Sequence, residues 1–401
     1  MLYLKQLLKK IPPVYSLNAR IKAARTVRSY HALSEYYQRK AKEDSIVYRE
    51  GDVASLVKNR LAQRGVNVSP VPKGNLRLFW VCANYDQDSS GIIQGLQKLG
   101  EVILFESRPI KYEQIWPEGS ELKTARQENS QRILAQVKES LKIGPVHAVI
   151  GQMWAHTIDP DVLNKLQEMG LIVVNISMDD RHAFRGRRVN GKWTGTAGLI
   201  GSIDLACTAA KECCLWYLAE GCPSIYLPEA SDPELFKPLN KHKLYDVSFV
   251  GKAYGIRSKI VKAIEKTGVH VKCFGSGWPN GIISTYKMPE LFARSRIVLG
   301  IGTISHCTDF YALKMRDFDG PMSGSLYITH DNPDLYDSYE VNKEIITYGT
   351  PDECAEKIRY YLANADEREK IAKAGRLRAE KEHTWEKRFE KVFRTLELIS
   401  A

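Results

Sequence analysis

The chain has 401 residues, of which 44% are hydrophobic and 26% charged, and its net charge is +11 at neutral pH. That length exceeds what one ordinary core holds, so two domains of roughly 150–200 residues are expected, and the composition excludes long disorder, a collagen-like repeat and a coiled coil. No apolar run reaches the ~18–20 residues that span a bilayer, and the N-terminus lacks the features of a secretory signal. The sequence therefore predicts a cytoplasmic protein.

The eight cysteines form no C-x-x-C pair and have no His/Cys spacing typical of zinc. Several of them lie in apolar runs, which favours small buried thiols in a reducing compartment. The sequence thus predicts no metal site.

The basic charge is concentrated at the N-terminus. Residues 1–70 hold seven lysines, seven arginines and five acidic residues, a net charge of +9, whereas the rest of the chain carries only +2. Apolar residues recur there at helical spacing on both sides of Pro12-Pro13, where a break is expected. This basic helical arm has two open interpretations, a solvated cap on the next domain or a peripheral contact of residues 1–30 with the inner membrane face. A nucleic-acid partner is not expected, because no recognised module is present and the body of the chain is nearly neutral.

Strands and helices alternate from residue 76 onward. Apolar runs predict strands at 76–83, 101–105, 147–151, 171–177, 203–208 and 224–228, and helices at 91–99, 121–142 and 160–169. Such alternation is typical of a parallel sheet covered by helices. We expect a Rossmann-like domain over residues 71–235.

A second alternation follows a proline-containing linker at 229–244. Strands are predicted at 246–250, 270–274, 296–301, 326–329 and 344–348, and helices at 257–267, 289–294, 332–338, 351–364 and 365–382. This pattern predicts a second Rossmann-like domain over residues 236–383. A last amphipathic helix is expected over residues 384–401.

Two glycine-bearing turns follow strands of the second domain, at the sheet edge where open α/β sheets bind ligands. In the first, Gly251 precedes a helix, and Lys252 and Arg257 are placed to neutralise a diphosphate near the helix N-terminus; an ordinary strand–helix turn is the alternative. In the second, Gly275 and Ser276 permit close backbone approach, and Trp278 borders a base or sugar; here the alternative is a tight turn with a packing tryptophan.

The third segment, Lys314–Gly324, carries the strongest signal. It follows His306, which stands after a strand end, and it crowds charge at the start of a helix that runs into an apolar strand. The charged residues include Lys314, Arg316 and Asp319, and the helix ends at Ser323-Gly324.

These residues resemble the donor-binding motif of GT-B glycosyltransferases, in which an acidic residue after Phe binds the nucleotide ribose. The pattern over 314–335 is similar to the CgeB-type, spore-maturation-like branch, and segments 226–238, 246–257 and 382–388 resemble further parts of that family. The resemblance implies an α/β fold of GT-B type: two Rossmann-like domains facing across a cleft, with the final helix crossing back to the N-terminal domain.

The resemblance also implies an activity. A nucleotide diphosphate sugar would bind the second domain, with Asp319 at the ribose and cations at the phosphates, and the sugar would pass without a metal or other cofactor to an acceptor hydroxyl on a glycan, lipid-linked or protein-linked partner. One departure matters: the large retaining families carry a glutamate eight positions before the ribose acid, where this chain has Tyr311. Asp309 or His306 are candidate replacements, and the stereochemistry of transfer stays open.

If the reaction inverts the anomeric centre, a base must deprotonate the acceptor hydroxyl. The candidates stand after strands of the first domain: Asp86, His156 and Asp180. Two other functions stay open, a GT-B-type nucleotide-sugar epimerase and a non-catalytic protein that binds sugar nucleotides or acts as a scaffold.

Overall fold

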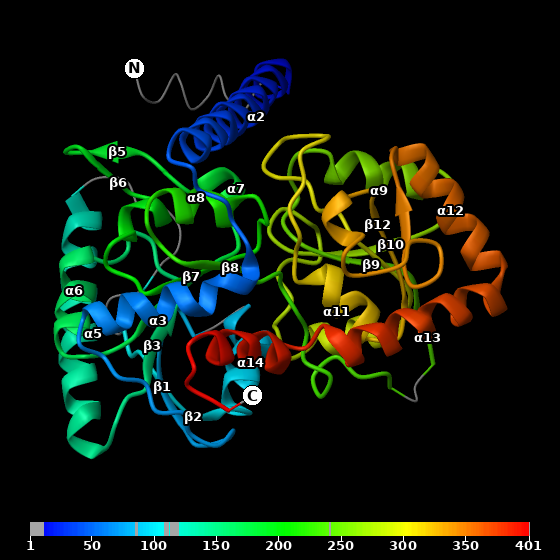
Figure 1. Ribbon diagram of the computed structural model, residues 1–401. Coiled ribbons are helices and arrows are strands. Elements are labelled where there is room, and N and C mark those ends of the chain that lie inside the picture. The colour runs from blue at the N-terminus through cyan, green and yellow to red at the C-terminus, as the bar shows by residue number, and fades with distance from the viewer. Residues whose placement is uncertain (1–11, 85–86, 108–111, 113–119, 240–241, 401) are drawn as a thin grey trace. The chain divides into compact units, whose positions relative to one another are not determined.

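The computed structural model describes residues 12–84, 87–107, 112, 120–239 and 242–400, with side chains from residue 17 in the first helix and from residue 124 in the helix that begins at 120. The chain divides into two compact units (Figure 1). Unit 1 comprises Met1–Leu33 and Ala230–Thr384, and unit 2 comprises Ser34–Glu229 and Trp385–Ala401.

Unit 2 is built on a six-stranded sheet with the order β2-β1-β3-β4-β7-β8, and every neighbouring pair is parallel. The strands are β1 (Leu76–Val81), β2 (Gly100–Leu104), β3 (Ala148–Gly151), β4 (Val173–Ser177), β7 (Leu205–Thr208) and β8 (Ser224–Tyr226). The central strands β3, β4 and β7 are buried along their whole length. Near-continuous apolar runs such as these are what a sheet covered on both faces requires.

Helices and short helical turns connect the strands of unit 2. They are η1 (Glu50–Asp52), α3 (Val53–Gln63), η2 (Asp88–Ile92), α4 (Ile93–Gln97), α5 (Ser120–Ile143), α6 (Pro160–Glu168), α7 (Asp180–Ala183), η3 (Thr196–Leu199) and α8 (Cys213–Ala219). One feature that the sequence interpretation omitted is a hairpin of β5 (Arg188–Val189) and β6 (Lys192–Trp193). Its turn, Asn190-Gly191, has positive φ at both residues, and Asn-Gly is a strong hairpin signal.

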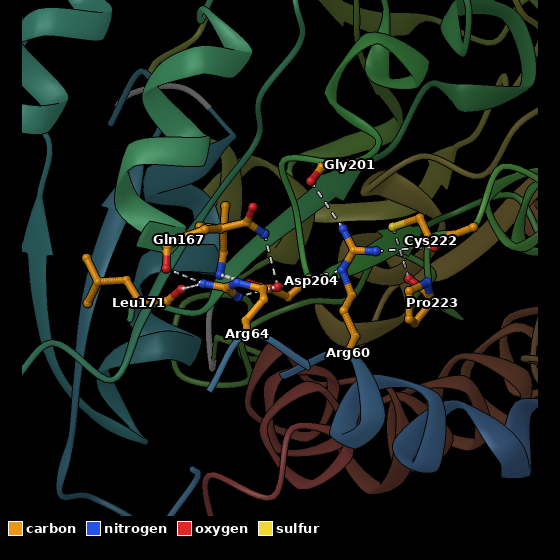
Figure 2. Close-up of polar contacts among 10 residues, drawn as sticks. Arg60, Arg64, Gln167, Leu171, Gly201, Asp204, Cys222 and Pro223 are labelled. Atoms are coloured by element: carbon orange, nitrogen blue, oxygen red, sulfur yellow. Dashed lines mark hydrogen bonds and ion pairs between the residues drawn. The ribbon is translucent and has the colours of Figure 1, made fainter. Parts of the chain in front are cut away.

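A buried carboxylate fixes α3 to the sheet of unit 2. Asp204, fully buried before β7, accepts a bond from the backbone N–H of Val173 at 2.8 Å. Arg64 pairs with the same carboxylate at 2.5 Å, and Arg60 lies 3.7 Å from it; Figure 2 shows both arginines converging on Asp204, with Arg64 also donating to the carbonyl of Leu171. Because these cations satisfy an otherwise unpaired buried charge, α3 is part of unit 2.

Unit 1 is built on a five-stranded parallel sheet with the order β10-β9-β11-β12-β13. The strands are β9 (Tyr245–Val250), β10 (Val271–Phe274), β11 (Ser295–Leu299), β12 (Leu326–His330) and β13 (Ile346–Tyr348). The helices are α9 (Arg257–Glu265), α10 (Met288–Ala293), α11 (Arg316–Met322), η4 (Pro333–Leu335), α12 (Pro351–Ala363) and α13 (Ala365–Glu382).

Alternating side chains of this sheet enter two separate cores, as the period of two in a strand requires. Ile297 and Leu299 of β11 pack into a core with α9 and α12, and these two helices lie side by side in Figure 1. Val298, between them, enters the opposite core with Phe318 of α11 and Phe292 of α10. The sheet is therefore covered on both faces, as the sequence predicted for this half.

The basic segment 1–70 divides between the units. Helix α2 (Pro12–Glu43) begins at the two prolines, because proline is tolerated in a first helical turn. In unit 1, Val27 and Tyr30 pack against a small cluster around Phe310. In unit 2, Tyr37 is buried and stacks on Trp216 with ring centroids 5.6 Å apart. The arm that the sequence suggested as one segment thus has part of its apolar surface in each core.

The last helix, α14 (Trp385–Thr395), belongs to unit 2, whereas α13 before it belongs to unit 1. Trp385 packs so closely on Gly95 that a Cβ there would lie 2.4 Å from the tryptophan Cβ. Arg388 Nε donates to the carbonyl of Pro228 at 3.0 Å, and Lys391 Nζ donates to that of Tyr226 at 2.9 Å. Helix α14 is therefore bonded to residues 226–228, which directly precede the second segment of unit 1 in the sequence.

Candidate donor site

The topology of unit 1 marks one place for a ligand. From β9 the chain moves to β10 on one side, and later strands are added beyond β11 on the other, so the strand order reverses between β9 and β11. Ligands of open α/β sheets bind at the carboxyl ends of the strands at such a point. Here Gly251 follows β9, Ile301 follows β11, and α11 begins at Arg316.

Two guanidinium groups meet at this point. Nη1 atoms of Arg257 and Arg316 lie 3.3 and 3.1 Å from where a Cβ on Gly251 would be. Arg257 donates to the carbonyl of Lys252 at 2.9 Å, and both arginines donate to the carbonyl of Ile301, at 3.4 and 3.2 Å. The arginine pair, Arg257 and Arg316, was predicted as two phosphate partners from separate motifs, and the fold brings them together.

Within the described residues neither arginine of the pair forms an ion pair, although the charge of Arg316 acts on the buried carboxyl groups of Asp317 and Asp319. Arg257 is 4% exposed, and the Nε atoms of both arginines are buried without a hydrogen-bond partner. Burial, and then the neighbouring charge of Arg316, lower the pKa of Arg257 to about 10. Phe249 lies beneath both guanidinium groups, and Tyr254 beneath that of Arg257 at 4.2 Å. Two like charges held this close, one of them buried and neither in an ion pair, are unfavourable unless an anion joins them.

The two glycine-bearing turns predicted from the sequence, one after β9 and one after β10, contact each other beside the arginine pair. Gly275 has φ of +127°, and a Cβ there would lie 2.4 Å from the carbonyl oxygen of Gly251. Ala253 N–H donates to the carbonyl of Ser276 at 2.8 Å, and the Trp278 indole N–H donates to that of Gly251 at 2.7 Å. The tryptophan therefore holds the loop after β9. Its predicted contact with a base or sugar stays a prediction, as do the ligand roles of the two glycines and Ser276.

The start of α11 is held by a residue that was not among the predicted site residues. Asp317 is buried and accepts bonds from the backbone N–H of Lys314 at 2.7 Å and from the Tyr327 hydroxyl at 2.6 Å. Burial raises the pKa of this carboxyl group. By fixing the first turn of α11, Asp317 sets the direction in which Arg316 leaves the helix. Lys314 lies half-buried before that turn and Lys252 is exposed after β9.

The remaining residues of the predicted motif lie deeper in unit 1. Asp319 is 1% exposed; one carboxyl oxygen accepts from the Ser231 hydroxyl at 2.7 Å, and the other has no hydrogen-bond partner. Burial raises its pKa well above the usual range. Ser323 bonds the carbonyl of Gly320, and Gly324, with φ of +74°, ends α11 against Pro238. The ribose role of Asp319, with its one unpaired oxygen, stays a prediction, as do the donor roles of Ser323 and Gly324.

The loop 303–311, between β11 and α11, forms the other side of the site. Gly255 packs on it with φ of +60°, where a Cβ would lie 3.0 Å from the carbonyl oxygen of Ser305. The rings of His306 and Tyr254 are 5.9 Å apart, and burial together with Lys22 lowers the pKa of His306. The ring of Tyr30 in α2 packs on that of Phe310 in this loop, with centroids 4.8 Å apart. The first part of α2 thus braces the loop that carries His306.

Sequence reasoning also missed a pair of buried side chains at the ends of β12 and β13. His330 is 2% exposed, and its Nδ1 lies 3.3 Å from the hydroxyl of Tyr348, which itself donates to the carbonyl of Gly300. Burial, and then the charge of Arg257, lower the pKa of His330 to about 4. Its ring packs at a tilt against that of Tyr311, the residue at the expected glutamate position, with centroids 5.4 Å apart. The sequence shows only a histidine in an apolar strand. Its lowered pKa could not be predicted, because the burial that causes it comes from the fold.

The three candidate bases belong to unit 2. Asp86 lies outside the described residues. His156 is 4% exposed, with Nδ1 3.0 Å from the carbonyl oxygen of Thr194. Asp180 is buried and accepts bonds from the hydroxyls of Ser177, Thr196 and Tyr217 at 2.6–3.2 Å, and its burial raises its pKa. In this structure both residues hold loops of unit 2, and their catalytic roles stay predictions.

The described residues include no group of three or more His, Cys, Asp or Glu side chains placed to hold a metal ion. Within the same ranges, none of the helices combines the length and apolar character needed to cross a bilayer.

Comparison with known proteins places this geometry in a fold family. Sucrose-phosphate synthase from Thermosynechococcus elongatus superposes with a TM-score of 0.56 and 10% sequence identity, covering 80% of this chain and 99% of that one. HepE from Anabaena, in complex with UDP-glucose, has a TM-score of 0.54 and 11% identity, covering 80% of this chain and 99% of that one. A glycosyltransferase from Rickettsia africae has a TM-score of 0.54 and 14% identity, covering 81% of this chain and 98% of that one. The chain has the GT-B fold. Residues 257–394 of this GT-B chain also match the sequence family described as glycosyl transferase-like. No curated protein sequence matches it.

The family match begins at Arg257 and includes Arg316, so the arginine pair lies inside the glycosyl transferase-like segment. The prediction of a GT-B fold from the motif in residues 314–324 is confirmed. The CgeB-type branch stays a prediction.

Proposed function

We propose that this GT-B protein transfers a sugar from a nucleoside diphosphate sugar to an acceptor hydroxyl. The observation that carries the proposal is the arginine pair at the switch point of the sheet: two guanidiniums, one of them almost fully buried, and neither in an ion pair within the part of the chain that the structure describes. Planar guanidinium groups bind phosphate oxygens in a bidentate manner, and a diphosphate carries the charge that the pair lacks. The Anabaena HepE structures, which hold UDP-glucose or UDP and glucose, support a donor of this class.

The same geometry serves the chemical step. When the bond to the sugar breaks, negative charge grows on the leaving diphosphate, so fixed cations at that position stabilise the transition state more than the ground state. Because Arg257 and Arg316 are already held by backbone carbonyls, little reorganisation is needed. We propose that these cations do the work that a divalent ion does in metal-dependent transferases, and that the reaction needs no bound metal.

Further details of this proposal come from the sequence resemblance. The pattern over residues 314–335 supports the CgeB-type branch, a ribose contact by Asp319 and an acceptor on a glycan, lipid or protein bound by unit 2. All eight cysteines are buried thiols, which fits a reducing compartment such as the cytoplasm.

Thermal denaturation with a panel of nucleoside diphosphates tests the donor site. One of UDP, GDP, ADP or dTDP should raise the midpoint, and the matching nucleoside should raise it much less, because the nucleoside lacks the diphosphate. Asp319→Asn keeps an acceptor for Ser231 and should weaken the diphosphate and its nucleoside by a similar factor, since both carry the ribose. If no diphosphate changes the midpoint, the proposal is wrong.

A second candidate function is nucleotide-sugar binding without transfer, which Tyr311 in the place of the usual glutamate favours. A nucleotide-sugar epimerase with the same donor site is the other alternative function. Incubation with the donor identified above separates them: a transferase releases the nucleoside diphosphate, an epimerase yields an isomeric donor, and a binding protein leaves the donor unchanged.

A further inference from the structure

The first part of α2 carries an unusual charge pattern. The first 34 residues of the chain contain seven Lys or Arg and no Asp or Glu. Of these cations, four lie in the described part of α2 and are exposed: Arg20, Lys22, Arg25 and Arg28. Because this stretch has no acidic side chains of its own to neutralise the cations, its positive charge attracts external anions.

Within the described residues none of these four side chains forms an ion pair. The later part of the same helix behaves differently: Lys40 pairs with Asp44 at 2.7 Å, and Arg39 lies 3.9 Å from Glu43. The run of four cations without an ion pair therefore lies in the segment that belongs to unit 1.

Apolar side chains stand among these cations on the solvent side of the helix. Leu17 is 60% exposed and Ile21 is 40% exposed. With Arg25 and Arg28 they recur at spacings of four, four and three residues, so the four side chains share one face. Val27 and Tyr30 point to the loop 303–311 instead. The outer face of α2, defined as Leu17, Ile21, Arg25 and Arg28, is thus turned away from the core of unit 1.

We propose that the outer face of α2 docks on an anionic membrane surface. Leu17 and Ile21 would enter the boundary between headgroups and acyl chains, while Arg25 and Arg28, with Lys22 and Arg20 on the flanks, would bind lipid phosphates. Exposed apolar side chains between the cations favour lipid over nucleic acid, since a phosphate backbone offers nothing to bury them. This inference goes beyond the proposed transfer reaction and does not depend on it.

The inner face of the same helix adds a consequence. Tyr30 packs on Phe310 and the Cys307 thiol lies 3.8 Å from the carbonyl oxygen of Ala23, so α2 braces the loop beside the arginine pair. Membrane docking would therefore hold a structural support of the donor site at the lipid surface, where a lipid-linked acceptor is found.

Sedimentation of the full-length protein with vesicles tests the proposal. We expect binding to phosphatidylcholine vesicles that contain about one-third phosphatidylglycerol, weak binding to phosphatidylcholine alone, and loss of binding at high salt. Arg25→Glu with Arg28→Glu should lower the partition coefficient by roughly a hundredfold, and Leu17→Ser with Ile21→Ser by about tenfold. The matched control is Lys370→Glu with Lys373→Glu, two exposed lysines of α13 in the same unit, which should leave binding unchanged.

Three results would overturn the proposal. Equal binding of both vesicle types would exclude the charge-dependent contact. An equal loss in the α13 control would show a general effect of net charge. Binding that survives the serine variant but not the glutamate variant, together with comparable retention on soluble polyphosphate or RNA, would show a polyanion site without lipid insertion. An unchanged thermal unfolding midpoint without nucleotide establishes that the α2 variants remain folded.

Discussion

Replacing Arg316 by methionine should change stability and binding in opposite directions. The Nη1 atoms of Arg257 and Arg316 lie 3.3 and 3.1 Å from one point beside Gly251, so they are no more than about 6.5 Å apart. Two unit charges at that separation repel by roughly 2–3 kcal/mol at an effective dielectric constant of ~20. Methionine removes the repulsion and keeps most of the apolar stem, while the bond to Ile301 at 3.2 Å and the attraction of Arg316 for the carboxyl groups of Asp317 and Asp319 are lost. We expect the free energy of unfolding without ligand to stay constant or to rise by up to about 2 kcal/mol.

The same substitution should weaken the nucleoside diphosphate, because a hydrogen bond to a charged group contributes about 1.5–3 kcal/mol. That corresponds to roughly a ten- to hundredfold higher Kd. Urea denaturation measures the stability, and titration calorimetry measures the diphosphate and the nucleoside, the latter expected to be unaffected. Lys259→Met, at an exposed lysine of α9, is the control. A clear loss of stability with unchanged Kd would refute the reasoning and make the arginine pair purely structural.

Three further outcomes are expected. Gly275→Ala should destabilise the protein by at least roughly 2–3 kcal/mol, because the new Cβ would meet the carbonyl oxygen of Gly251 at 2.4 Å in a left-handed conformation; an unchanged urea midpoint would contradict this. The pKa of His330 is lowered to about 4, so the stability that the neutral imidazole contributes is present above pH 6.5 and is lost as the pH falls toward 4. In urea denaturation the free energy of unfolding of the wild type should therefore fall by roughly 2–3 kcal/mol between pH 7 and 4.5, and that of His330→Gln should fall visibly less. Tyr30→Ala removes the contact with Phe310 and should raise the Kd for the nucleoside diphosphate about three- to tenfold with an unchanged circular dichroism spectrum; an unchanged Kd would show that α2 does not position the donor loop.

The fold was predictable because its signals are local. Short apolar runs bounded by glycine and polar residues place all five strands of the unit 1 sheet within two residues of their observed bounds. The alternation with helices then requires a parallel sheet. The same rule predicts where ligands bind, and on that basis Arg257 and Arg316 were selected from separate motifs. The fold brings the two side chains together beside Gly251, and their role as phosphate partners stays a prediction.

The features that were missed depend on pairs distant in sequence. The pairing of Asp204 with Arg64 fixes α3 to unit 2 across 140 residues, and neither residue has an unusual sequence context. The support of α11 by Asp317 depends on Tyr327, and the low pKa of His330 depends on burial. The arm of residues 1–70 was treated as one segment because its charge is uniform, whereas its apolar residues are shared between two cores.

Donor turnover tests the central claim most directly. The protein is incubated without acceptor with UDP-, GDP-, ADP- and dTDP-linked sugars, and mass spectrometry measures the free sugar and nucleoside diphosphate released. Many transferases slowly pass the sugar to water, so we expect release from one donor class, reduced at least tenfold in Arg257→Met and unchanged in Lys259→Met. Binding and turnover of none of these donors by the folded wild-type protein would contradict the assignment of the arginine pair as the diphosphate site of a glycosyltransferase.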